Sequence, residues 1–219
     1  MLGVSLGTAQ GTSAATFYIV HHIIVQATLF LAAGLIERVG GTTSINKLGG
    51  LLAASPVLAV LFLVPALNLG GIPPFSGFLG KVALFQATAE QGSPLGYVLI
   101  AAGAIVSLLT LYALIRVWSL AFWRGRDEVE DYDSELVRNI VEAPDLGAPT
   151  STPVTTTRRI PRLMLAATGG MVVIGLALSV FAGPLFVISD EVGENLESPT
   201  FYVNIVFPDS ANNPGGLDE

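Results

Sequence analysis

The chain contains no cysteine and few charged residues. The absence of cysteine excludes disulfide bonds and thiolate metal sites. Charged residues make up only 12% of the 219 residues, whereas soluble domains average about 25%. No stripe of basic residues is present to hold a phosphate backbone, so nucleic acid is not an expected partner. The two histidines are adjacent, which is a poor arrangement for a structural metal site.

Apolar residues are abundant instead, at 52% of the chain, and they gather in long runs. Such runs, without polar alternation, predict membrane-spanning helices. We expect an all-α, polytopic transmembrane bundle of about five spans, preceded by the end of a sixth. That partial helix before residue 8 indicates a fragment of a longer protein. The spans are expected at about Ala14–Ile36, Leu51–Leu69, Phe75–Ala89, Leu95–Trp123 and Leu163–Ile188.

The chain therefore divides into four regions. Residues 1–123 form a transmembrane part with a partial first helix and four spans, and residues 163–188 form the last span. Between them lies a polar loop at 124–162, and an acidic tail follows at 189–219.

The basic residues predict the orientation. Six of the ten lysines and arginines lie in the 124–162 loop, and none follows Arg162. The positive-inside rule places that loop in the cytoplasm and the C-terminus outside. Alternation of the spans then puts the 37–50 loop outside, together with Arg38 and Lys47.

The stretch Ile72–Lys81 is the strongest candidate site. It places a double proline, two glycines and a single lysine between apolar runs. An ammonium group within a bilayer costs about 2.5–3.5 kcal/mol on insertion scales, and such groups commonly mark proton or ion paths. Burial disfavours the charged form of a lysine, so Lys81 could exchange a proton. The alternatives are a lysine that snorkels toward the interface and one held in a static ion pair. Glu90 is too far along the same helix to be its partner.

The first expected span carries a second candidate site. Tyr18, His22 and Gln26 recur every four residues and share one helical face, while His21 points about 100° away. An imidazole takes and gives protons near neutral pH, so His21 and His22 are candidate relay groups. The alternative is a histidine hydrogen-bonded for packing. Arg116, in the fourth span, stays charged, which favours pairing or the tuning of an acid over a proton relay.

The sequence contains no motif for phosphate binding, covalent catalysis or metal coordination. The glycines at 70 and 71 are not followed by the GK[ST] of a phosphate loop, and they are expected to end a helix before the prolines. No nucleophile–base arrangement and no metal-ligand spacing occurs in the sequence. We therefore expect no cofactor and no metal.

Four segments of the chain match a known family: Phe17–Leu31, Ile72–Lys81, Leu111–Arg116 and Ser198–Val206. They resemble the D-type subunit of the multisubunit Mrp-type sodium/proton antiporters, which are relatives of the proton-pumping membrane subunits of respiratory complex I. The segment Ser198–Val206 favours the antiporter over the complex I branch. The resemblance covers nearly the whole chain but only the final part of the family's subunit.

The resemblance implies roles for the candidate residues. Lys81 matches the ionisable residue on the family's second broken helix, near the exit of a hydrated axis of charged groups. His21 or His22 matches the linking segment of that axis. The family often has a lysine where this chain has Gln26, so the relay here would depend on water or on the histidines. The family's glutamate–lysine pair on earlier helices is absent, so the chain alone should not transport.

The expected function is that of a transporter subunit rather than an enzyme. The resemblance implies a fragment of an ion-translocating subunit in the cell membrane. There it would exchange protons for a monovalent cation such as sodium and assemble with other antiporter subunits in the lipid bilayer. Two alternatives remain: a complex I-type pump subunit coupled to a redox arm, and a non-conducting scaffold in which Lys81 is merely paired.

Overall fold

The computed structural model describes residues 3–126, 128–129 and 161–198. Every regular element in these ranges is a helix, so the predicted all-α fold is confirmed. Most of the predicted 124–162 loop and the tail after residue 198 lie outside the described residues. The elements are η1 (Val4–Leu6), α1 (Ala9–Gly40), η2 (Ile45–Lys47), α2 (Leu51–Ala54), α3 (Pro56–Gly70), α4 (Ser76–Glu90), α5 (Pro94–Trp118), η3 (Ser119–Trp123), α7 (Arg162–Val180) and α8 (Ala182–Glu197).

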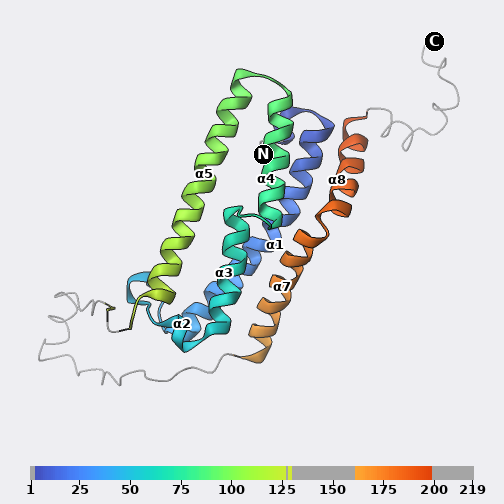
Figure 1. The fold of residues 1–219 in the computed structure, drawn as a ribbon. Coiled ribbons are helices and arrows are strands. Elements are labelled where there is room, and N and C mark those ends of the chain that lie inside the picture. Colours follow the sequence, from blue (N-terminus) through green and yellow to red (C-terminus); the bar gives the residue numbers. More distant parts are fainter. Residues whose placement is uncertain (1–2, 127, 130–160, 199–219) are drawn as a thin grey trace, which may run out of the picture.

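Helix α1 is continuous and forms the centre of the bundle, packing against α3, α4, α7 and α8 (Figure 1). The Thr8 side chain caps its N-terminus by accepting a hydrogen bond from the Gly11 amide at 3.1 Å. Gly41, at φ 73°, ends the helix. Its 32 residues span about 48 Å. The helix exceeds the predicted bounds of 14–36, because those bounds followed the apolar side chains alone and the capping groups lie beyond them.

Helices α3 and α4 are two halves of one crossing. Gly71, at φ 82°, ends α3 by donating its amide to the carbonyls of Leu67 and Asn68, and the two prolines follow. Helix α4 then continues in the same direction along the bundle (Figure 1). Each half has 15 residues and spans about 22 Å, less than the roughly 30 Å of a hydrocarbon core. The sequence prediction counted them as separate spans, whereas their end-to-end arrangement places the break inside the bundle.

The last crossing is broken as well. Helix α7 stops before Phe181, and α8 continues beyond it (Figure 1). The prediction had one span at 163–188 followed by the acidic tail, but α8 remains helical to Glu197. It does so because it packs along the N-terminal part of α1, where the Ser13 hydroxyl donates to the Asp190 carboxylate. The first acidic residues of the predicted tail therefore belong to the bundle.

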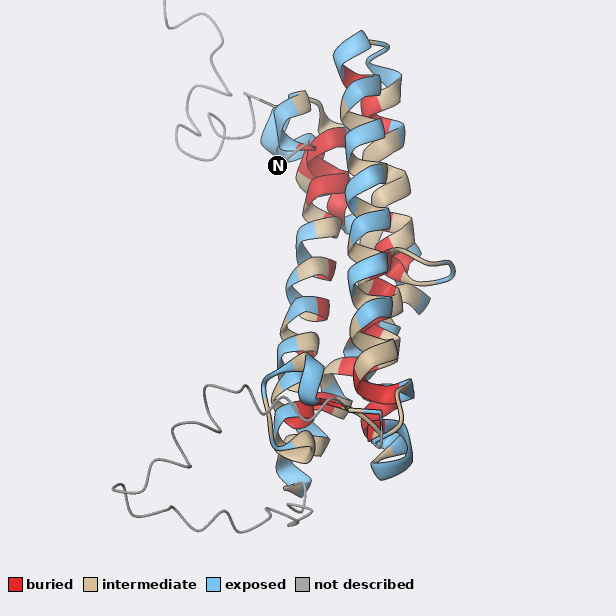
Figure 2. Cartoon of the chain, turned by 90° about the vertical axis from the view of Figure 1, so that its left-hand side faces the viewer, coloured by how far each residue is buried: buried red, intermediate tan, exposed pale blue. Residues whose placement is uncertain are grey.

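Helix α5 lies at the edge of the bundle, against α3 and α4. The π-helical turn η3 prolongs it to Trp123. Aromatic rings join α3 to α5 and its extension η3. The ring centroids of Trp118 and Phe122 are 4.7 Å apart, and those of Phe62 and Phe122 are 5.5 Å apart. None of the residues in the most apolar stretch of α5 is buried, and its outer side is exposed along the bundle (Figure 2).

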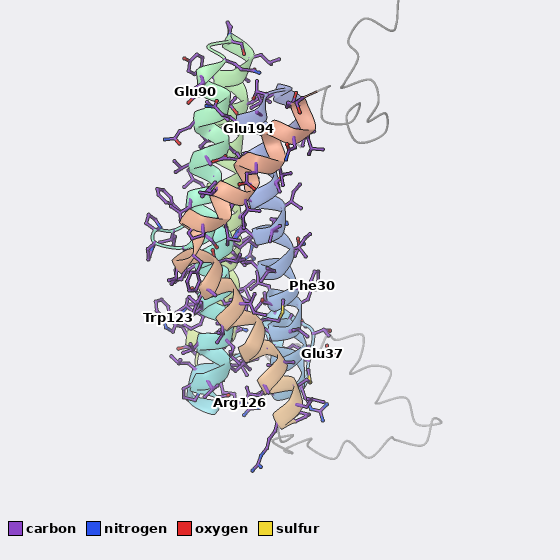
Figure 3. All side chains as sticks on the ribbon, turned by 90° about the vertical axis from the view of Figure 1, so that its right-hand side faces the viewer. Phe30, Glu37, Glu90, Trp123, Arg126 and Glu194 are labelled. Carbon is purple, nitrogen blue, oxygen red and sulfur yellow. The ribbon has the colours of Figure 1, made fainter. Side chains whose placement is uncertain are left out.

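The described helices have the dimensions and surface of a membrane bundle. Within the described ranges, three helices are long and apolar enough to cross a membrane: α1, α5 together with η3, and α7. Large apolar side chains on their outer faces, Phe30 and Trp123 among them, are exposed (Figure 3). A water-soluble monomer rarely leaves so much contiguous apolar surface uncovered. The predicted multi-pass transmembrane bundle is confirmed.

The loop after α1 and the chain after η3 lie at the same end of the bundle. The Arg124 guanidinium donates to three carbonyls of that loop, and the Gly50 amide donates back to the Arg124 carbonyl at 2.7 Å. The acceptors are Ile45 (3.2 Å), Asn46 (2.6 Å) and Leu48 (2.5 Å). The prediction that the 37–50 and 124–162 loops lie on opposite sides of the membrane is therefore wrong. It failed because it counted α3 and α4 as two crossings.

The two ends of the bundle differ in charge. Figure 3 shows Glu90 and Glu194 at one end and Glu37 and Arg126 at the other. We call the end that carries the described loop cations the basic end and the opposite one the acidic end. Among the described residues, the basic end carries Arg38, Lys47, Arg124, Arg126 and Arg162 with the acids Glu37 and Glu128, and the acidic end carries Glu90, Asp190, Glu191, Glu194 and Glu197. Such an asymmetry of cations is the pattern that orients membrane proteins.

This arrangement predicts which loops can be labelled from the same side of the membrane. Because the chain has no cysteine of its own, single cysteines can report the side of each loop. Asn46→Cys and Glu128→Cys, both at exposed positions, should react with an impermeant maleimide from the same side of the membrane in the intact complex. Glu194→Cys should react from the opposite side. Labelling of Asn46→Cys and Glu128→Cys from different sides would contradict the arrangement.

Candidate functional site

Lys81 lies on α4 with its ammonium group directed at the break between α3 and α4. Its Nζ donates to the carbonyls of Leu69 at 3.0 Å and Gly70 at 3.1 Å. These carbonyls belong to the last turn of α3, where they lack helical partners and carry the negative end of the helix dipole. Gly71 allows the close approach, since a Cβ there would lie 2.9 Å from Nζ. Lys81 thus joins the two halves of the broken crossing.

These contacts bear on the two alternatives for Lys81. Its ammonium group is directed to the break within the bundle rather than to the far end of α4, which does not fit simple snorkelling. Among the described residues, no carboxylate pairs with it. Backbone dipoles rather than an acid therefore meet its charge.

His21 is buried at the same break, with 1% of its surface exposed. Its Nδ1 lies 2.9 Å from the Ser76 hydroxyl at the start of α4. Its Nε2 is buried and has no hydrogen-bond partner among the described residues. Gly77 faces this nitrogen, because a Cβ there would lie 3.0 Å from Nε2. The imidazole therefore presents one bonded and one free nitrogen to α4.

A buried polar network holds the start of α4 in place. Asn68 Oδ1 accepts hydrogen bonds from the Gly77 amide at 2.9 Å and from the Ser76 hydroxyl at 3.3 Å. The Ser76 amide donates to Ser179 Oγ on α7 at 2.8 Å. Helices α1, α3, α4 and α7 thus meet at one polar point.

Sequence reasoning did not single out the residues of this network. Asn68 could have been found, since it is the lone polar side chain in the apolar run of α3 and stands just before the glycines. Ser76 lay inside the candidate stretch but was given no role. Ser179, on α7, carried no signal in the sequence.

The two histidines occupy different environments. His21 is buried, whereas His22 is only half-buried. The Tyr18 ring contacts both, with centroid distances of 5.7 Å to His21 and 5.8 Å to His22. Tyr18 also packs on Gly80, where a Cβ would lie 3.0 Å from its ring. The structure thus brings Tyr18 and His21 against α4 and leaves His22 at the margin.

Two of the predicted polar residues are exposed and take no part in the hydrogen bonds described at the break. Gln26 is exposed on α1, and Arg116 is exposed near the end of α5. No described residue forms a hydrogen bond or ion pair with the Arg116 side chain. No group of three metal-ligating side chains occurs in the described part of the chain either.

The geometry defines a class of membrane protein. An apolar bundle has two broken crossings, and one break gathers an ammonium group, a buried imidazole and a hydrogen-bonded amide and hydroxyls. Ionisable side chains beside interrupted helices are the construction used by ion-translocating membrane proteins. Residues 1–118 match the family described as NADH:quinone oxidoreductase/Mrp antiporter, transmembrane. The chain belongs to this family.

Relatives within the family are antiporter subunits. The D-type subunit of the Na(+)/H(+) antiporter of Alkalihalophilus pseudofirmus is 33% identical over 206 residues, which cover 94% of this chain and 36% of that protein. The D-type subunit of Bacillus subtilis is 36% identical over 128 residues, which cover 58% of this chain and 25% of that protein. The predicted resemblance to the D-type antiporter subunits is confirmed. The chain spans about a third of the length of the first relative.

A solved structure has the same fold. A protein chain in the Mrp complex from Dietzia sp. DQ12-45-1b matches with a TM-score of 0.73 and 31% sequence identity. The match covers 92% of this chain and 41% of that chain.

Proposed function

We propose that the chain is part of an ion-translocating membrane subunit that exchanges protons for a monovalent cation, with sodium as the first candidate. One observation carries the proposal: the Lys81 ammonium group is held at the break of a crossing, beside the buried His21. The names of the D-type relatives support antiport over other ion transport. The partners would be the other subunits of a membrane antiporter complex and the lipid around it.

The proposed relay runs through the break. Lys81 exchanges a proton while its position is fixed by two carbonyls. His21 can bind a proton on one ring nitrogen and release one from the other. Its Nδ1 meets the Ser76 hydroxyl, and its Nε2 stands free. His22 would exchange protons between this point and the bundle's margin, and Tyr18 would position both rings.

One observation favours a second interpretation of Lys81. Its two carbonyl bonds are those that a lysine would make if it only capped α3. In that interpretation the chain is a non-conducting scaffold. The family also includes quinone oxidoreductase subunits, which leaves the complex I-type pump as a further alternative.

The proposed orientation follows the charge of the two ends. Cations near helix ends stay in the cytoplasm, so the basic end faces the cytoplasm and the 124–162 loop begins there. The acidic end, with the end of α8, faces outward across the cell membrane.

The function is tested in everted membrane vesicles that contain the intact complex. Sodium added after a proton gradient has formed should dissipate the gradient, as read by a pH-sensitive fluorescent dye. Vesicles without the complex are the control. No response to sodium or to any other monovalent cation would overturn the proposal. Proton pumping that requires quinone reduction would instead assign the chain to the oxidoreductase branch.

A further inference from the structure

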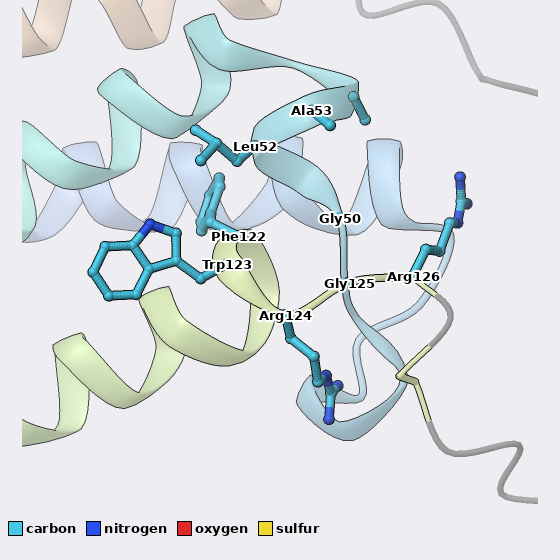
Figure 4. A pocket seen from close by; sticks show the side chains of 9 residues that line it. Gly50, Leu52, Ala53, Phe122, Trp123, Arg124, Gly125 and Arg126 are labelled. Carbon is cyan, nitrogen blue, oxygen red and sulfur yellow. The ribbon is translucent and has the colours of Figure 1, made fainter.

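A pocket of about 610 Å³ opens at the basic end, beside the junction of α5 and η3 with the following chain (Figure 4). Its apolar wall includes Leu52 and Phe122, and its rim includes Trp123, Arg124 and Arg126. The candidate proton site lies elsewhere, at the break between α3 and α4. The pocket is therefore separate from the proton site.

The back of the pocket is hydrogen-bonded and closely packed. The Gly50 amide is bonded to the Arg124 carbonyl, and the Arg124 guanidinium is held by three loop carbonyls. Gly49 packs so closely that a Cβ there would lie 2.6 Å from Val129. Phe122 is buried in the stacked rings that join α5 to α3. Hydrogen bonds and close packing thus define this wall of the pocket.

The rim of the pocket is open. Trp123 is 68% exposed, and Arg126 is also exposed. Figure 4 shows their side chains on different sides of the chain segment that connects them. Arg124 contributes a fixed positive charge, and its Nε is buried without a partner among the described residues. Of the acids that the structure describes at this end, neither Glu37 nor Glu128 lines the pocket.

The position of the pocket along the bundle indicates which kind of ligand it can hold. It lies where the apolar stretch of α5 and η3 ends and the cations begin, which is the level of the lipid headgroups. Tryptophan prefers this level because its ring is amphipathic. Basic pockets between membrane helices on the cytoplasmic side suit anionic headgroups. Apolar walls and two arginines together fit a ligand that has both a hydrocarbon chain and a negative charge.

We propose that this pocket binds an anionic glycerophospholipid. Arg126 contacts the headgroup phosphate, while Arg124 adds positive charge without leaving its carbonyls. Leu52 and Trp123 cover the glycerol and the first part of an acyl chain. The site holds for an antiporter or a scaffold alike, because it uses none of the residues at the break.

Photo-crosslinking tests the proposal. Leu52, at the pocket wall, is replaced by p-benzoylphenylalanine in the intact complex, which is reconstituted in vesicles of equal phosphatidylglycerol and phosphatidylethanolamine. Lipid adducts found by mass spectrometry should be enriched in phosphatidylglycerol. Arg126→Gln should lower that enrichment by about fivefold, the effect of one cation near an anionic surface. Arg162→Gln, an exposed cation at the same end but outside the pocket, is the matched control and should leave it unchanged.

Three results would overturn the proposal. One is an adduct ratio equal to the composition of the vesicles. Another is crosslinking to a peptide instead of a lipid, which would show that protein covers the pocket. The third is an equal loss in Arg126→Gln and Arg162→Gln, which would show attraction to the whole basic end rather than to this site.

Discussion

Lys81→Ala in the intact complex is expected to abolish cation/proton exchange while the complex still assembles. The change removes the ionisable group at the break and leaves the Leu69 and Gly70 carbonyls without their observed donor. A positioned proton donor contributes about a hundredfold or more to a proton transfer, so exchange should fall by at least about that factor. Dye fluorescence in everted vesicles measures exchange, and native gel electrophoresis of the same membranes measures assembly.

Lys81→Arg separates a relay from a structural cap. Arginine can still donate to the two carbonyls, but it does not release its proton at any ordinary pH. The relay proposal therefore expects an assembled complex without exchange. Lys47→Arg, an exposed lysine at the basic end, is the matched control and should behave as the wild type. Full exchange in Lys81→Arg would sink the relay role and leave Lys81 as a cap of α3.

Gly77→Ala is expected to prevent stable packing of α4 against α3. A Cβ at this position would lie 1.9 Å from the backbone carbonyl oxygen of Asn68 and 3.0 Å from His21 Nε2. Backbone cannot move aside as a flexible side chain can, so the destabilisation should reach or exceed the roughly 1–3 kcal/mol typical of overpacking. The amount of assembled complex in the membrane and its thermal unfolding temperature measure the effect.

The control for this change is Gly169→Ala on α7. Nothing lies within 4 Å of a Cβ at Gly169, and alanine is favoured over glycine inside a helix by about 1 kcal/mol. The control should assemble as well as the wild type or better. Equal assembly of the Gly77→Ala and Gly169→Ala variants would show that the close contact at Gly77 is not needed.

The helices were predictable from the sequence because an apolar segment in a membrane must form its backbone hydrogen bonds within itself, as a helix does. Their bounds were less so. Thr8 caps α1 from a polar stretch, and the acidic residues after 188 remain helical because α8 lies against α1. The hydropathy of the sequence predicts neither contact. Counting α3 and α4 as separate spans had the larger consequence, since it reversed the side assigned to the 37–50 loop.

The candidate site was predictable in part. The lysine after the double proline was predictable as a site residue because a charge within a bilayer is costly. The helical repeat grouped Tyr18, His22 and Gln26 on one face, but a repeat does not say which face a neighbour covers. In the structure Gln26 is exposed and His21 is buried. The link to Ser179 joins residues far apart in the sequence, so only the folded chain reveals it.

The contact between α8 and the start of α1 has a consequence for the membrane insertion of this segment. Gly193 lies so close to Ala9 that a Cβ on it would fall 2.3 Å from the Ala9 carbonyl oxygen. Helices α1 and α8 thus meet at the acidic end, so the described chain begins and ends at the same end of the bundle. Removing all of it would leave the orientation of any helices joined to it unchanged. Removing α5 alone would invert everything that follows.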